Sequence, residues 1–86
     1  MIKFDSNNFE IIVSDTALTL FGVNNKKVYF FNETSQFLFE NILAGHSIEH
    51  ILKLFCEGNS YDVNLVCNDF KKTIDYLLVE GILYNE

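Results

Sequence analysis

The sequence predicts an α+β fold, a winged helix-turn-helix in which a three-stranded antiparallel sheet is followed by three helices. Short runs of β-branched and aromatic residues, separated by turn residues, fill the first third of the chain. From residue 32 onwards, the apolar residues recur instead at the spacing of amphipathic helices. The 86 residues, 49% of them hydrophobic, suffice for one core and are too few for two. We therefore expect a single domain over residues 1–86.

Three strands are expected at residues 9–13, 17–21 and 27–31. The first is a β-branched run that ends at the turn-prone Ser14-Asp15. Between the second and third strands lies Asn24-Asn25, and asparagine tolerates a positive φ, so this pair is expected to form a tight hairpin. Connections this short predict an antiparallel meander.

Three helices are expected to follow the strands. The first begins at Asn32 or Thr34, either of which can cap a helix, and ends at Gly45. The second is capped by Ser47 and broken by Gly58-Asn59-Ser60, and the third runs from a cap at Asp62 to Gly81. An apolar stripe marks the third helix at Val63, Val66, Phe70, Ile74, Leu77 and Leu78. A short extended tail, residues 82–84, follows it.

The composition excludes several classes of function. A net charge of −6, with six lysines and no arginine, argues against binding nucleic acid or an anionic membrane. No apolar run reaches the ~20 residues that cross a bilayer, and residues 1–5 do not resemble a signal peptide. Cys56 and Cys67 are too few for a disulfide scaffold, and we expect them to be small buried hydrophobic residues. A cytoplasmic protein is the simplest expectation.

No motif indicates catalysis, a metal or a cofactor. His46 and His50 have the HxxxH spacing, but Gly45 and the Ser47 cap put His46 outside the helix, and no third ligand is evident. Asp69 and Asp75 lie too far apart in helical phase to form a carboxylate pair. There is no nucleophile elbow and no phosphate-binding glycine loop. We therefore expect no enzyme activity and no cofactor.

The stretch from Val28 to Leu83 resembles the PqqD-like family, the recognition elements for precursor peptides of ribosomally synthesised natural products. The resemblance rests on an ordered set of short motifs rather than on any one of them. The set consists of Phe31-Asn32, Phe37-Leu38-Phe39, Ala44-Gly45-His46-Ser47, Ile48-x-x-Ile51-Leu52, Tyr61-Asp62 and Tyr76-Leu77-Leu78-x-x-Gly81-Ile82-Leu83.

The resemblance implies a stand-alone, non-catalytic protein that binds the leader of a precursor peptide. In similar proteins the leader adds as an extra strand to the sheet, between the third strand and the third helix, a mode of recognition called β-augmentation. The protein then presents the leader to a modifying enzyme, either a radical SAM maturase or a leader peptidase of the lasso-peptide kind. The open strand edge also allows a homodimer.

Four of the six lysines fall on the two elements that frame this expected groove, and they predict a positive rim suited to an acidic leader. By strand alternation, either Tyr29 and Phe31 or Val28 and Phe30 face the helices, and the sequence does not decide between the two pairs. The candidate peptide-binding residues are Lys26, Lys27, Val28, Tyr29, Phe30, Phe31, Cys67, Phe70, Lys71, Ile74 and Leu78, with Lys72 as a fourth member of the rim.

Two other functions fit the same order of elements. One is a winged-helix DNA-binding regulator, whose third helix would read bases with little besides Lys71 and Lys72. The other is a generic dimerisation module.

Overall fold

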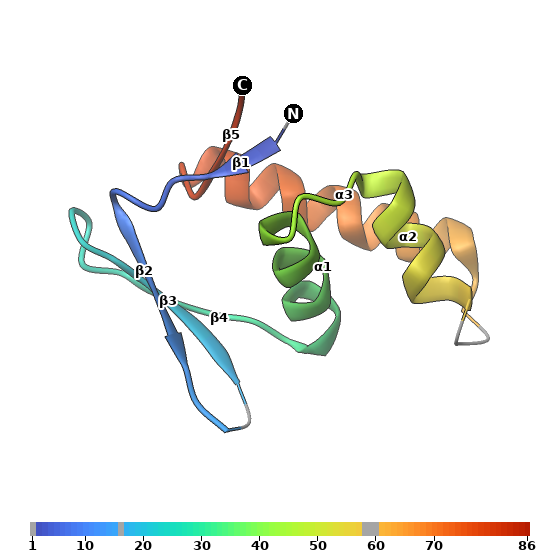
Figure 1. Ribbon diagram of the computed structural model, residues 1–86, viewed down its shortest axis with the longest axis horizontal. Helices are drawn as coiled ribbons and strands as arrows, with labels where there is room; N and C mark the ends of the chain where they lie inside the picture. Colours follow the sequence, from blue (N-terminus) through green and yellow to red (C-terminus); the bar gives the residue numbers. More distant parts are fainter. Residues whose placement is uncertain (1, 16, 58–60) are drawn as a thin grey trace.

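The structure is a computed structural model and describes residues 2–15, 17–57 and 61–86. It has the expected α+β architecture, with a three-stranded antiparallel sheet ahead of three helices (Figure 1). The sheet has the order β2-β3-β4, formed by Phe9–Val13, Leu18–Gly22 and Val28–Phe30. Both pairings are antiparallel, which confirms the predicted meander.

The third strand is shorter than predicted, and its hairpin has a different geometry. Lys27 lies outside the strand, although its carbonyl still accepts a hydrogen bond from the Gly22 amide at 2.8 Å. The left-handed residue of the turn is Lys26, with φ 61°, rather than Asn24 or Asn25. The Asn25 side chain supports the turn instead, because its Oδ1 atom accepts a hydrogen bond from the Lys27 amide at 2.9 Å.

The helices begin and end close to where the sequence places them. Helix α1 spans Glu33–Leu43, α2 spans Ile48–Glu57 and α3 spans Val63–Val79. The side chains of Asn32, Ser47 and Asp62 each accept a hydrogen bond from a first-turn amide, as predicted for caps. The predicted break at Gly58-Asn59-Ser60 lies outside the described residues.

Two glycines end helices in the same way. Gly45 and Gly81 have φ values of 89° and 77°, a conformation that a Cβ atom disfavours. After α1, the Gly45 amide bonds to the Ile42 carbonyl and the next amide bonds to the Asn41 carbonyl, and the same pair of bonds follows α3. This is the Schellman arrangement, which satisfies the last carbonyls of a helix and turns the chain back.

A second, two-stranded sheet was not predicted. Strand β1, Ile2–Phe4, pairs antiparallel with β5, Leu83–Asn85, so the two ends of the chain lie side by side (Figure 1). The core lies between these strands, the inner face of the larger sheet and the three helices. Its most deeply buried side chains include Leu20, Leu38, Phe39, Ile51, Phe70, Leu77, Ile82 and Leu83.

The cysteines only partly match their expected burial. Both are free thiols, but Cys56 is half-buried and Cys67 is exposed on α3. The prediction of two buried hydrophobic residues is therefore wrong for Cys67, because position 67 lies outside the apolar stripe of the helix. Among the helices of the described residues, none has the length and apolar composition needed to cross a membrane.

Candidate functional site

A groove lies between β4 and α3, where the resemblance leads us to expect one. Its volume is about 450 Å³. One wall comes from β4 and the start of α1, and the other from the second half of α3. The lining residues are Val28, Tyr29, Phe30, Phe31, Asn32, Ser35, Lys72, Thr73, Tyr76 and Leu77.

Within the part of the chain that the structure describes, strand β4 is an edge of its sheet, because its one neighbour there is β3. Pairs of residues in an antiparallel ladder alternate between hydrogen-bonded and non-hydrogen-bonded. The Gly22–Lys27 pair is bonded, so by this alternation Leu20–Tyr29 is the next bonded pair. The backbone N–H and C=O groups of Val28 and Phe30 therefore point away from β3, towards the free edge beside the groove.

The side chains of β4 and of Phe31, the residue after it, point alternately to the core and to solvent. Tyr29 is buried, and Phe31 packs against the core with its ring stacked on that of Phe39 at 5.1 Å. Val28 and Phe30 are 50% and 82% exposed. The pair that packs on the helices is therefore Tyr29 and Phe31, whereas Val28 and Phe30 present apolar surface beside the free edge.

Lysine 72 is the charged residue of the groove, and no carboxylate is among the lining residues. The other lysines of the expected rim lie elsewhere. Lys71 is exposed but does not line the groove, and Lys26 lies on the outer side of the hairpin with its Nζ atom 6.0 Å from the centre of the Phe21 ring. Lys27 is engaged by Glu80, with Nζ 3.4 Å from Oε1. The positive character of the groove is thus concentrated at one side chain.

A small polar network ties the β3–β4 hairpin to the end of α3. The Tyr29 hydroxyl donates to Glu80 Oε1 at 2.9 Å, and Asn25 Nδ2 donates to the same hydroxyl at 2.9 Å. Lys27 reaches the same carboxylate oxygen. We call these four residues, Asn25, Lys27, Tyr29 and Glu80, the hairpin latch. Since Tyr29 also lines the groove and its ring lies 6.5 Å from that of Tyr76, the latch fixes the distance between the two walls.

The latch shifts the pKa values of its members. The hydrogen bond from Tyr29, with help from Lys27, holds the pKa of Glu80 below its ordinary value of 4.5. The hydrogen bond that Lys27 donates to Glu80, and the negative charge of Glu80, raise the pKa of Lys27. Burial, followed by the hydrogen bond to Glu80, raises the pKa of Tyr29. Each shift favours the ionisation state that the latch uses: ionised carboxylate, protonated lysine and neutral phenol.

These shifts give the latch a pH window. Because folding lowers the pKa of Glu80, its contribution is present above its ordinary pKa and is lost as the pH falls through the folded value. The raised pKa values of Lys27 and Tyr29 give contributions that are lost only in strongly alkaline solution. We expect Glu80→Gln to lower Tm near neutral pH, and the difference from wild type to shrink as the pH falls below the ordinary carboxyl pKa of 4.5 and through the lower folded value.

Thermal unfolding followed by circular dichroism at a series of pH values measures this difference. Glu10→Gln, at an exposed glutamate outside the latch, is the control. Tyr29→Phe is expected to cost on the order of 1 kcal/mol through the lost hydrogen bond. A Tm difference between wild type and Glu80→Gln that stays constant from neutral to acidic pH would contradict this role for the carboxylate.

The structure brings together only part of the residue set chosen from the sequence. The four residues from Val28 to Phe31, β4 and the residue after it, do line the groove. From α3, however, Phe70 and Ile74 are buried in the core, Leu78 packs against it, and Cys67 and Lys71 are exposed outside the groove. The helix instead contributes Lys72, Thr73, Tyr76 and Leu77.

This difference has a simple cause. Apolar periodicity identifies the side of α3 that packs on the core, and the groove runs along the neighbouring side. Leu77 belongs to both sides, but Lys72, Thr73 and Tyr76 lie outside the apolar stripe, so apolar spacing gives no signal for them. Glu80 was missed for a related reason, since its partners on the hairpin are more than fifty residues away in sequence.

The two histidines lie closer together than the sequence suggests. His46 does precede α2, as expected, yet its ring centroid is 4.8 Å from that of His50. The turn at Gly45 brings the His46 ring beside that of His50 in the first turn of α2, although His46 itself lies outside the helix. Among the described residues, no group of three or more His, Cys, Asp or Glu side chains is placed to hold a metal ion.

Comparisons with known proteins reveal similarity in structure. The chain matches no protein-family model, and no curated protein matches it. One similar solved structure is a lasso peptide synthetase B1 complexed with the leader peptide, with a TM-score of 0.87, 13% identity and coverage of 98% of both chains. Another is TbiB1 in complex with the TbiA(beta) leader peptide, with a TM-score of 0.84 and 16% identity, covering 98% of this chain and all of that one. At these identities the likeness establishes the fold.

Proposed function

We propose that this chain is a stand-alone, non-catalytic recognition element that binds the leader of a ribosomally synthesised precursor peptide and presents it to a modifying enzyme. The whole chain acts as one PqqD-like domain in this proposal. The leader adds to the sheet as a fourth strand along β4, and its side chains enter the groove beside α3. The enzyme is a radical SAM maturase or a lasso-type leader peptidase.

The observation that carries the proposal is the free edge of β4 beside an open groove. An unpaired strand edge invites association, and proteins usually blunt it or use it. Here the N–H and C=O groups of Val28 and Phe30 lie at the free edge beside the groove, so an incoming strand gains main-chain hydrogen bonds and side-chain contacts together. The two similar solved structures, both of complexes with leader peptides, support the same reading.

The charge of the groove indicates the kind of leader that it accepts. Lys72 lines the groove, and none of the other described lining residues is charged, in a chain whose net charge is −6. An acidic residue of the leader gains a partner in Lys72, whereas a basic residue finds no opposite charge among the described lining residues. We therefore expect a leader segment that combines apolar residues with at least one carboxylate.

A direct test is titration of a fluorescently labelled cognate leader with the protein, followed by anisotropy. We expect saturable one-to-one binding at micromolar concentration or below. A folded sample that leaves the anisotropy unchanged at such concentrations overturns the proposal.

Two adjacent lysines provide a matched pair for this assay. Lys72→Glu reverses the charge that lines the groove and is expected to weaken leader binding about fivefold. Lys71→Glu makes the same change one position away, outside the groove, and should alter affinity by less than about twofold. Equal effects of the two substitutions would mean that general charge, rather than a contact in the groove, governs binding.

The DNA-binding alternative is less consistent with the surface of α3. Its exposed lysines, Lys71 and Lys72, are balanced on the same helix by the exposed Asp69 and Asp75. A recognition helix needs a net positive face to approach phosphates. We infer that α3 is not a reader of duplex DNA.

A further inference from the structure

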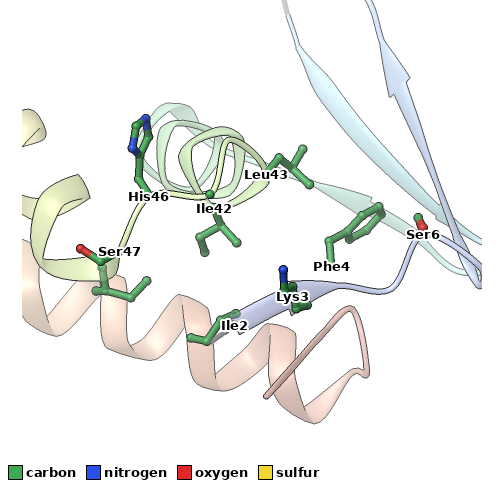
Figure 2. A pocket seen from close by; sticks show the side chains of 10 residues that line it. Ile2, Lys3, Phe4, Ser6, Ile42, Leu43, His46 and Ser47 are labelled. Carbon is green, nitrogen blue, oxygen red and sulfur yellow. The ribbon is translucent and has the colours of Figure 1, made fainter. Parts of the chain in front are cut away.

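A second cavity lies on a different part of the molecule, between β1 and the turn that joins α1 to α2. Its volume is about 620 Å³, larger than that of the groove. Figure 2 shows side chains of β1 along one side of it, with the last turn of α1 and the α1–α2 turn along the other. The lining residues are Ile2, Lys3, Phe4, Ser6, Ile42, Leu43, Gly45, His46, Ser47 and Ile48.

This cavity and the groove have no lining residue in common. They lie at opposite ends of α1, since the groove is lined by residues at the start of this helix and the cavity by residues at its end. A leader strand on β4 therefore leaves the cavity open. The molecule can hold one partner at each place.

The cavity has an apolar floor and a polar rim that carries one lysine. Ile42 is buried, Ile2, Phe4 and Ile48 are only half-buried, and Leu43 is 41% exposed. Lys3 and His46, both exposed, supply the polar edge. No carboxylate is among the described residues that line it, although acidic residues outnumber lysines two to one in the chain. An occupant with apolar side chains and negative charge complements this surface.

We propose that this cavity is the docking site for the modifying enzyme, which inserts an acidic segment with one or two large apolar side chains. The inference rests on the proposed function, because a presenting protein has to bind the leader and the enzyme at once through separate surfaces. The apolar side chains contact Ile2, Phe4, Ile42 and Leu43, and a carboxylate of the segment faces Lys3 and His46. Such a partly buried apolar patch with a polar rim is typical of a protein interaction site.

The test uses two readouts on the same variants. Leader affinity is measured by anisotropy, and the rate of precursor modification by the purified enzyme is measured as the protein is titrated in. Leu43→Asp and Lys3→Glu change exposed residues at the rim of the cavity. Their matched controls are Leu65→Asp and Lys71→Glu, which are exposed on α3 and line neither the cavity nor the groove.

We expect both rim variants to bind the leader within about twofold of wild type and to raise the half-saturating protein concentration in the modification assay about tenfold. The controls should leave both readouts unchanged. A thermal melt checks that each variant is folded. If Leu43→Asp does not fold, Lys3→Ala takes its place in the test.

Unchanged half-saturation in the rim variants, with normal leader binding, overturns the inference and leaves the proposed function intact. Failure of the wild-type protein to bind leader overturns the proposed function itself. Dodecanoate serves as a probe for another occupant. Saturable dodecanoate binding that Lys3→Glu abolishes, together with unchanged modification, assigns the cavity to a small amphiphile and overturns the docking proposal.

Discussion

Replacing Phe30 with proline is expected to weaken leader binding by about tenfold or more while leaving the fold intact. Proline has no N–H, so the substitution removes the donor that Phe30 offers at the free edge of β4. The β3–β4 ladder loses no bond, because Thr19 and Phe30 form a non-hydrogen-bonded pair. Proline is tolerated at such edge positions.

The control for this substitution is Phe30→Ala, which removes the same side chain and keeps the N–H. Phe30 is 82% exposed, so neither change empties the core. The difference in leader affinity between the proline and alanine variants isolates the main-chain hydrogen bond. Equal affinities of the two variants, with equal melting temperatures, would show that the leader does not pair with this edge.

Phe39→Ala is expected to destabilise the protein by about 3–5 kcal/mol, the largest effect on stability that we anticipate. Phe39 is fully buried, and its ring lies 5.3 Å from that of Phe4 and 5.1 Å from that of Phe31. Phe39, on α1, therefore packs against both Phe4 of β1 and Phe31, the residue that follows β4. Small domains are stable by only about 5–15 kcal/mol, so a loss of this size approaches the whole margin.

Urea unfolding followed by circular dichroism measures this loss, with Phe30→Ala as the matched control at an exposed phenylalanine. The control should change stability by less than about 0.5 kcal/mol. A Phe39→Ala variant as stable as Phe30→Ala would contradict the packing described here. Phe31 lines the groove but also stacks on Phe39. The substitution Phe31→Asp would therefore disturb the core as well as the groove, and its effect on leader binding could not be assigned to the groove.

Elements with strong local signals were predictable from the sequence. Asn32 and Asp62 cap helices, and Gly45 and Gly81 end them, because capping depends on hydrogen bonds within a few residues of the chain. Strand alternation predicted that either Tyr29 and Phe31 or Val28 and Phe30 face the helices. The burial of Tyr29 in the structure shows that it is the first pair.

Features that depend on distant partners were not predictable in the same way. The extended tail expected at residues 82–84 overlaps β5, but its pairing with β1, across almost the whole chain, has no local signal. The hairpin latch joins Tyr29 and Lys27 to Glu80, and each of these residues reads as an ordinary polar position in isolation. The side of α3 that lines the groove could not be predicted, because apolar spacing identifies only the side that packs on the core.

The central proposal is that a leader strand pairs with β4. Amide hydrogen exchange followed by NMR, with and without saturating leader, tests it most directly. Pairing on β4 should slow exchange of the Val28 and Phe30 amides, which face the free edge, and change little at Tyr29, which already bonds to β3. Slowed exchange at the β2 edge instead, at Phe9, Ile11 and Val13, or unchanged exchange at Val28 and Phe30, would contradict the proposal.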